Sequence, residues 1–555
     1  PWSYIGYWGD HQIVYLLRLL ELSRKFHPDR VARLLDRRVF AYANVPYRIK
    51  PFESLVDDPK NTVTYDDALA SRIEERVAER GNDGKLIVDA RGEVYRVNLL
   101  EKLLVPLLAK LGTFVLGGGI WLNTQRPEWN DANNALVGHG VSMVTLCYMR
   151  RYVTFLDQTL EARSGDVEVS KEVGVWLRET ATALREARPH WEGGTVDPGL
   201  RSKLLASLGN ASSRYREVLY RQEGFTGTEP LSIDEVRSLL DDVAAAADYS
   251  IAANEREDGL YHAYNILHRN GDTVGLERLD PMLEGQVAAL SSGAVSPGRA
   301  VRVLESLFAS ELYRADVRTF ILYPDRRLPR FLDKNRVPSE KVESIRGVEP
   351  VLDLGDHSLL VRDATGSYRF NADLRNAGDL RARLDGLEAE LGDSIGAIRE
   401  PLLELYEHVF HHRAFTGRAG TMFGFEGLGS VYWHMVSKLL LAAQEAFFVG
   451  LDAGADPEIL QELGRLYYRV REGLGFNKSP SEYGAFPADP YSHTPKHAGA
   501  QQPGMTGQVK EEILTRFGEL GLRVDGGSVR FETSLLRPRE FCEEPGSLRF
   551  LDVDG

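Results

Sequence analysis

The feature that most constrains this chain is a repeated alternation between amphipathic helical segments and long loops without periodicity. In the first segment, the apolar residues Ile13, Leu17 and Leu20 recur at helical spacing. The same spacing predicts helices over residues 11–37, 64–80, 97–112, 136–163, 168–187, 198–222, 232–250, 281–313, 377–412, 428–449, 456–472 and 506–520. A helical solenoid would show a repeat of about 34–45 residues, which the sequence lacks. We therefore expect a mainly α fold, an (α/α) toroid whose loops build a concave site at one end.

Two regions depart from the helical pattern. Residues 318–370 alternate in strand fashion between Gly, Asp and Thr turns, and the sequence RVDGGSVRF near the C-terminus favours a hairpin. The chain also begins without an initiator Met, within what reads as a motif, so we expect a further domain upstream. The predicted organisation is a helical toroid over residues 1–317 and 377–521, a small β insertion over 318–376 and a short C-terminal β element over 522–555.

Composition excludes several classes of function. The 555 residues carry a net charge of −14, which argues against nucleic acid and anionic membranes as partners. Only Cys147 and Cys542 are present, so neither a disulfide framework nor a thiolate metal site is expected. No apolar run reaches the length of about 18 residues that a membrane span needs, and the N-terminus has no signal peptide pattern. We expect a cytoplasmic protein, and a homodimer is compatible with the sequence.

The stretch from Gly117 to Ser142 is the strongest candidate for a functional loop. Three glycines lead into a segment with two Trp and two carboxylates, followed by an apolar helical pattern. Exposed Trp rings cover the C–H face of a sugar ring, while amides and carboxylates bind its hydroxyls. The alternative is a surface loop with one buried Trp. This interpretation predicts sugar contacts from Trp121, Gln125, Arg126, Trp129 and Asn130.

A second loop, at 254–267, has a similar mixture of charged and aromatic residues. Gly259 interrupts the helical pattern there. We expect this loop to form another wall of the site, although a charged surface loop with aromatic anchors fits the same residues. The candidates are Glu255, Arg256, Asp258, Tyr261 and His262.

Aromatic placement supports a carbohydrate cleft. Five of the seven Trp fall in the candidate site stretches, whereas random placement would scatter them. These are Trp2, Trp8, Trp121, Trp129 and Trp433. A large buried anchor is the alternative for Trp433, which opens a helix.

Three stretches stand in order along the chain: Trp129-Asn130-Asp131, Tyr432-Trp433-His434 and Met505-Thr506-Gly507-Gln508. Together they resemble the inverting glycoside phosphorylases that include cellobiose and chitobiose phosphorylase, which have a six-hairpin (α/α)6 barrel. The resemblance implies that Asp131 is the general acid and that phosphate binds near His434 and Thr506. A helix N-terminus, such as the one that Thr506 opens, favours an anion. His434 as a buried core histidine and Thr506 as a simple cap are the alternatives.

Two departures from the family pattern point toward hydrolysis. Trp8 stands where the family has a phosphate-binding Arg, and Asp489 lies beside the place of a phosphate-binding Gln. Losing a cation and gaining an anion disfavours bound phosphate, and a carboxylate there can activate water. We therefore expect a glycoside hydrolase on a phosphorylase-like frame, with a glycoside phosphorylase as the alternative. Arg256 or Arg418 could restore the missing cation.

Inverting cleavage requires an acid, and hydrolysis also requires a base on the opposite face of the sugar. Asp131 is the predicted acid, because Trp129 and Trp121 would desolvate its carboxylate and raise its pKa. Glu128 is the reserve acid and Asp489 is the predicted base. Glu482 and Asp258 are further candidate bases.

The remaining candidates bind substrate or anions. Asp10 and His11 would bind sugar hydroxyls in the deepest subsite, unless Asp10 only caps a helix. The full set of substrate-binding candidates is Trp8, Asp10, His11, Trp121, Gln125, Arg126, Trp129, Asn130, Glu255, Arg256, Asp258, Tyr261, His262 and Trp433. The anion-binding candidates are His434, His497, Thr506 and Gly507.

No metal or cofactor is expected. His408, His411 and His412 would share one face of a helix, but no carboxylate joins them in the usual pattern. Inorganic phosphate remains a candidate co-substrate. The expected partner is an oligosaccharide or polysaccharide.

Two other classes stay open. A polysaccharide lyase uses Tyr, His and Arg to remove a proton beside a uronate, and the segments NEREDGLYHAYN and PYSHTPKH carry such side chains. The third class is a sugar-binding scaffold without turnover. The products separate the enzymes: lyases release unsaturated uronides, phosphorylases release sugar 1-phosphates and hydrolases release free reducing sugars.

Overall fold

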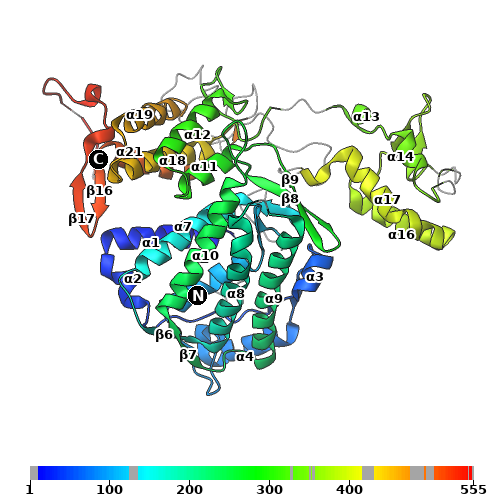
Figure 1. The fold of residues 1–555 in the computed structure, drawn as a ribbon, viewed down its shortest axis with the longest axis horizontal. Helices are drawn as coiled ribbons and strands as arrows, with labels where there is room; N and C mark the ends of the chain where they lie inside the picture. Colours follow the sequence, from blue (N-terminus) through cyan, green and yellow to red (C-terminus); the bar gives the residue numbers. More distant parts are fainter. Residues whose placement is uncertain are drawn as a thin grey trace.

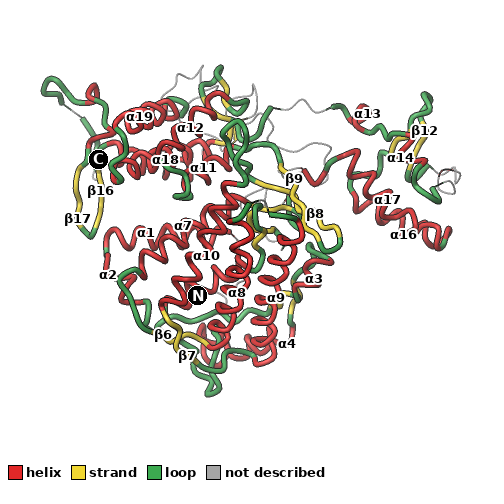
Figure 2. Tube along the Cα trace, viewed as in Figure 1, coloured by secondary structure: helices red, strands yellow, loops and turns green. Residues whose placement is uncertain are grey.

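The computed structural model of the chain describes residues 10–123, 135–194, 196–325, 329–348, 352, 357–414, 431–474, 493–494, 506–547 and 549–552. This part of the chain is mainly helical, with several small sheets (Figure 2). Most helices form a main body, and the described residues between 329 and 414 form a smaller unit at its side (Figure 1), here called the insertion unit. Among the described residues, no helix is long and apolar enough to cross a membrane.

The first half of the main body is built from long helices. They are α1 (Asp10–Phe26), α2 (Pro28–Leu34), α3 (Phe52–Asp57), α4 (Asp67–Arg80), α5 (Leu99–Leu111), α7 (Met143–Leu160), α8 (Lys171–Glu192), α9 (Pro198–Gln222) and α10 (Ile233–Ala252). The predicted helices at 97–112, 198–222 and 232–250 are confirmed. Their starts are readable in the sequence, because the side chains of Asn98, Asp197 and Ser232 accept N–H groups of the first turns.

Two helices differ from their predicted bounds. The helix predicted over 136–163 begins only at Met143, because residues 140–142 are paired as a strand. The helix predicted to stop at residue 187 continues through Pro189 to Glu192. Trp191 is buried in this last turn, so its packing stabilises the turn beyond the proline.

A five-stranded antiparallel sheet, which was not predicted, lies within the main body. Its order is β3 (Phe114–Val115), β4 (Gly119–Trp121), β5 (Gly140–Ser142), β8 (Tyr264–Asn270) and β9 (Thr273–Arg278). Strand β8 begins inside the segment that we predicted to be a loop, at 254–267. The strand β5 is central and pairs with both β4 and β8. It therefore joins two regions far apart in the sequence.

Among its described residues, the second half of the main body adds five further helices. They are α11 (Leu283–Ser291), α12 (Pro297–Ala309), α18 (Trp433–Asp452), α19 (Pro457–Arg471) and α21 (Thr506–Glu519). Two-stranded antiparallel sheets accompany the helices: β1 (Tyr47–Ile49) with β2 (Val63–Tyr65), β6 (Asp166–Ser170) with β7 (Thr228–Ser232), β10 (Tyr313–Arg314) with β11 (Thr319–Phe320), β14 (Val431–Tyr432) with β15 (His493–Thr494), and β16 (Leu522–Asp525) with β17 (Ser528–Phe531). The last pair is the hairpin expected from RVDGGSVRF.

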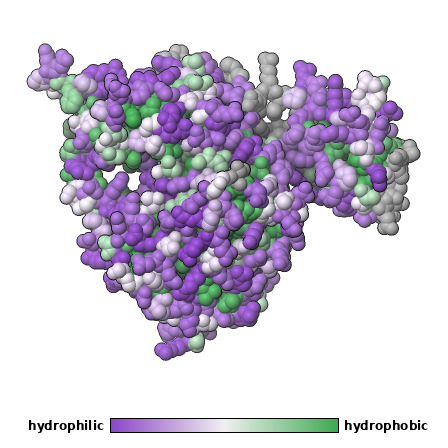
Figure 3. All heavy atoms as spheres, in the orientation of Figure 1, coloured by the Kyte–Doolittle hydropathy of each residue, from purple (hydrophilic) through white to green (hydrophobic). Residues whose placement is uncertain are grey.

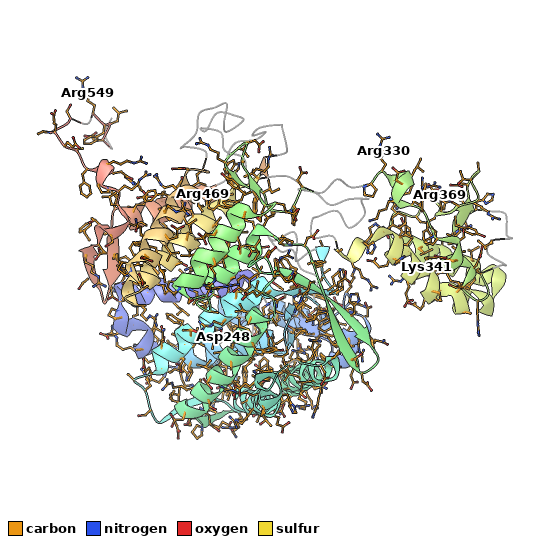
Figure 4. All side chains as sticks on the ribbon, turned by 45° about the horizontal axis from the view of Figure 1, so that its top comes forward. Asp248, Arg330, Lys341, Arg369, Arg469 and Arg549 are labelled. Carbon is orange, nitrogen blue, oxygen red and sulfur yellow. The ribbon has the colours of Figure 1, made fainter. Side chains whose placement is uncertain are left out.

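The insertion unit has a hydrophobic core of its own. Its elements are α13 (Phe331–Lys334), α14 (Ser339–Glu343), β12 (Leu360–Arg362), β13 (Tyr368–Phe370), α16 (Ala377–Leu391) and α17 (Asp393–Phe410). Buried residues from Val337 to Phe410 form one cluster, separate from the main core. The boundary expected at residue 376 therefore falls inside this core, because α16 and α17 pack on the β12–β13 pair. The unit stands out as a separate lobe in Figure 3, and its Lys341 and Arg369 lie far from Asp248 of α10 in Figure 4.

A half-buried charge network joins three helices of the main body. Arg151 of α7 lies between two carboxylates, with Nε 2.6 Å from Glu21 Oε1 and Nη1 2.7 Å from Glu445 Oε2. Arg18 of α1 also reaches Glu445, at 2.8 Å. The network therefore ties α1 and α18 to α7. Arg150, the residue of α7 that precedes Arg151, pairs with Asp248 of α10 at 2.8 Å.

Candidate active site

The N-termini of α7 and α11 lie together at one end of the main body, because the start of each contacts Ala263. Helices α7, α11 and α18 are packed side by side, and β11 contacts β14 directly before α18. The N–H of Met143, which opens α7, donates to the carbonyl of Ala263 at 3.0 Å, and that of Leu283 in α11 donates to Leu322 at 3.1 Å. The loop 254–262 lies at this same end. Because helix N-termini carry partial positive charge, the arrangement can attract an anion.

Glu284 is a carboxylate at this end that the sequence analysis missed. It lies in the first turn of α11, and the hydroxyl of buried Tyr264 donates to its Oε2 at 2.9 Å. Its charge is also felt by Tyr148 of α7, whose pKa burial raises to about 12. The available signal was a charged residue in the otherwise uncharged helix LEGQVAALS.

A hub of buried amides fixes the loop 254–262 to the sheet. The Nδ2 of Asn254 donates to the carbonyls of Gly117 and Ser250, at 3.2 and 2.7 Å. Its Oδ1 accepts from Asn265 Nδ2 at 2.9 Å and from the guanidinium of Arg278. Burial lowers the pKa of Arg278 to about 10. Sequence reasoning missed this hub, because only the fold brings the end of α10 together with β8 and β9.

The loop 254–262 is a tight polar turn, as its Gly predicted. Gly259 has φ +83°, and the N–H of Arg256 donates to the carbonyl of Leu260 at 2.8 Å. The Arg256 guanidinium pairs with Asp258 at 2.9 Å, while Glu255 pairs with Arg299 of α12. Burial alone would raise the pKa of Asp258, but the bonds from Arg256 and Leu260 lower it. The charge of Arg256 is thus balanced within the loop.

The aromatic residues of the same loop point into the protein. Tyr261 is buried, its N–H donates to Gln286 Oε1 at 2.8 Å, and burial raises the pKa of its hydroxyl. The Nδ1 of His262 lies 2.8 Å from the carbonyl of Leu279, and burial lowers the pKa of this imidazole. A neutral ring must donate to that carbonyl from Nδ1, which leaves Nε2 as an acceptor.

Trp121 lies in the core. Its side chain is only 4% exposed, and it packs in a small cluster with Phe52, Val115 and Leu205. The indole N–H donates to the carbonyl of Gly138 at 3.2 Å. Trp121 is therefore a buried anchor, which was the alternative interpretation of this loop, and neither face of its ring is open to a sugar.

Trp433 and His434 open helix α18, where the resemblance implied an anion site. Trp433 is buried in the main core, as expected for a large anchor. His434 is also buried, and its Nδ1 lies 3.5 Å from the hydroxyl of Tyr432. The pairing of β14 with β15 brings Tyr432 opposite His493. The imidazole thus lies at the positive end of a 20-residue helix.

Several sequence candidates have no described side chain. Asp10 and His11 begin α1, and Thr506 and Gly507 begin α21, as backbone positions only. The candidates Trp8, Gln125, Arg126, Glu128, Trp129, Asn130, Asp131, Asp489 and His497 lie outside the described residues. Within the described ranges, no three His, Cys, Asp or Glu side chains are grouped to hold a metal.

The comparison with protein families places one part of the chain. Residues 328–413 match the family model described as GH149 phosphorylase insertion domain 2. This range covers the insertion unit, including α16 and α17. No curated protein matches the chain. The similarity is to an insertion domain of glycoside phosphorylases, and it supports a carbohydrate-active enzyme of that phosphorylase-like kind.

Proposed function

We propose that this protein is an inverting glycoside phosphorylase, which cleaves an oligosaccharide or polysaccharide with inorganic phosphate. The observation that carries the proposal is the similarity of residues 328–413 to a GH149 phosphorylase insertion domain. The start of α18 supports it, because His434 lies in the first turn of this helix and an anionic co-substrate is favoured at a helix N-terminus. This reverses the preference for hydrolysis drawn from Trp8 and Asp489.

In the proposed reaction, the Asp131 carboxyl donates its proton to the glycosidic oxygen as the bond to the anomeric carbon breaks. A phosphate oxygen attacks that carbon from the opposite face and forms the new bond. The products are a sugar 1-phosphate of inverted configuration and a saccharide shortened by one unit. His434 and the starts of α18 and α21 are the proposed phosphate-binding groups. No other cofactor is part of the proposal.

We further propose that the main body is an (α/α)6 toroid. In its support, α7 packs against α1, α10 and α11, and α18 packs against α11, α19 and α21. Such a succession of neighbouring helices is what a ring of hairpins requires. The charge network of Arg151 joins three of them, α1, α7 and α18.

A product assay tests the function. Purified protein is incubated with a panel of α- and β-linked disaccharides and oligosaccharides, with and without phosphate. We expect sugar 1-phosphate only when phosphate is present. Asp131→Asn is expected to reduce the rate at least about 100-fold, the usual scale of general acid catalysis. Glu128→Gln removes the reserve acid from the same stretch, and a larger loss there than in Asp131→Asn would assign the acid to Glu128.

Other products would favour the other classes. Phosphate-independent release of reducing sugar, abolished by Asp131→Asn and by Asp489→Asn, would establish the hydrolase. An Asp131→Asn variant that keeps full activity contradicts the acid assignment. Unsaturated uronides would identify a lyase, and the absence of turnover on every glycoside would leave the binding scaffold.

A further inference from the structure

The insertion unit meets the main body at a polar contact with the stretch from Gly117 to Ser142, here called the central loop. The Nε2 of His139 lies 3.1 Å from the carbonyl oxygen of Arg413. His139 belongs to the turn before β5, and Arg413 belongs to a short turn directly after α17. The end of α17 lies beside β9 in Figure 1, and Glu407 of α17 feels the charges of Glu277 and His268 there.

On its own side, the insertion unit fixes the carbonyl of Arg413. The N–H of Arg413 donates to Glu407 Oε1 at 2.9 Å. His411 ends α17 with φ +53°, and its N–H donates to the carbonyl of Glu407 at 2.7 Å. Glu407 therefore fixes this turn twice, through its side-chain carboxylate and through its backbone carbonyl.

On the main-body side, His139 lies in the turn that leads into β5. Its carbonyl accepts from the N–H of Leu267 on β8 at 2.7 Å. The N–H of Gly138 donates to the carbonyl of Leu122 at 2.5 Å, so the turn is bonded to the strand end that precedes the loop. The N–H of His139 also donates to the carbonyl of Leu136 at 3.1 Å, so Leu122 and Leu136 are both bonded to this turn.

The imidazole keeps one protonation state at neutral pH. Burial, with the nearby charge of Lys60, lowers the pKa of His139 to about 4. A neutral imidazole can bond a carbonyl only through the nitrogen that bears hydrogen, so Nε2 is the donor to Arg413. The contact therefore does not titrate in the range where an enzyme of this kind works.

We propose that His139 is a positioning residue, through which the insertion unit holds the turn 136–139, which follows Asp131 closely in the sequence. The proposal rests on the proposed role of Asp131 as general acid. It assigns to the insertion unit a part in catalysis that depends on a single side-chain contact and on the turn that Glu407 supports.

Substitutions on both sides of the contact test this role in the full chain. His139→Leu removes the donor, while His139→Gln keeps an amide N–H near the position of Nε2. Steady-state kinetics give kcat and KM, and hydrogen exchange reports the amides of 136–140 and 411–414. We expect His139→Leu to lower kcat about tenfold with KM changed less than about twofold, since small displacements of catalytic groups have effects of this size. Exchange should become faster in both segments, and His139→Gln should stay close to wild type.

Changes on the insertion side complete the test. Glu407→Ala should reproduce the loss of kcat, whereas Glu404→Ala, at an exposed position of the same helix, should not. The proposal is overturned if His139→Leu speeds exchange but leaves kcat unchanged, or if His139→Gln is as impaired as His139→Leu. A wild-type protein without activity on any glycoside would instead overturn the proposed function, while exchange would still show whether His139 joins the units.

Discussion

At the scale of single residues, backbone geometry decides the position of the central loop. The three glycines at 117–119 read as an entry to a binding loop, but Gly117 and Gly118 lie in the turn between β3 and β4, and Gly119 begins β4. Gly119 has φ +138°, and a Cβ there would lie 2.3 Å from the carbonyl oxygen of Ser142. Only glycine lets β4 approach β5 so closely. The glycines therefore indicate a close approach of two strands and not a binding loop. Glu284 and Asn254 lie at the candidate site, although neither was among the predicted site residues.

Gly119→Ala is expected to destabilise the main body by about 2 kcal/mol or more, because it adds both a steric clash and an unfavourable φ. Urea unfolding measures the change, followed by Trp fluorescence for the main body and by far-UV circular dichroism for the insertion unit, whose sequence has no Trp. Gly386→Ala is the matched control: Gly386 lies inside α16 with open space around it. There alanine should stabilise its unit by roughly 0.5–1 kcal/mol. A neutral effect of Gly119→Ala would contradict the packing of β4 on β5.

At the scale of elements, the sequence predicts long helices well and short strands poorly. The helices α5, α9 and α10 combine apolar spacing with readable caps, so local information is sufficient. The strands β3, β4 and β5 have only two or three residues each, all buried, and show no alternation. Their pairing with β8 depends on chain folding over a long distance. The same reason hides Arg278, which reaches Asn254 only in the folded sheet.

The charge network between α1, α7 and α18 predicts acid sensitivity. Burial alone would raise the pKa of Glu445, but Arg18 and Arg151 hold it well below its usual range. A carboxyl with a lowered folded pKa stabilises the protein above its unfolded pKa, and this contribution is lost as pH falls through the folded value. Arg151→Met should therefore lower the free energy of unfolding at pH 7, by on the order of 2–3 kcal/mol.

The difference between wild type and Arg151→Met should shrink as the pH falls below the ordinary pKa of a glutamate, about 4.5. Urea unfolding at pH 7 and at pH 3.5 measures both values. Arg214→Met is the control, since Arg214 forms an exposed pair with Glu179, and such pairs contribute at most about 1 kcal/mol. A constant difference across pH would show that Arg151 acts by packing alone.

At the scale of the whole molecule, the main body and the insertion unit each bury a separate core. Leu104 belongs to the first and Leu402 to the second, and both are fully buried. The sequence marked the β segment of the insertion unit but assigned α16 and α17 to the toroid, because helical periodicity does not reveal which core a helix face meets. The match over 328–413 groups them with the β segment.

Separate cores predict separate unfolding. Leu402→Ala should speed hydrogen exchange in 377–410 and leave 143–160 unchanged, while Leu104→Ala should do the reverse. Each truncation is expected to cost its own unit about 2–5 kcal/mol. Exchange measured on the full chain, with and without moderate urea, reports both regions at once. Faster exchange of both regions in either variant would mean that the two cores unfold together.

The contact between β11 and β14 has a consequence for how such a chain can be assembled over evolution. The main body is left after β11 and re-entered at β14, and these two strands touch. Because neighbouring chain ends can be bridged by a short connection, the frame can close without the residues between them. A lineage can therefore gain or lose the insertion unit without a change in the arrangement of the main-body helices. A lineage without the unit would need a new partner for His139.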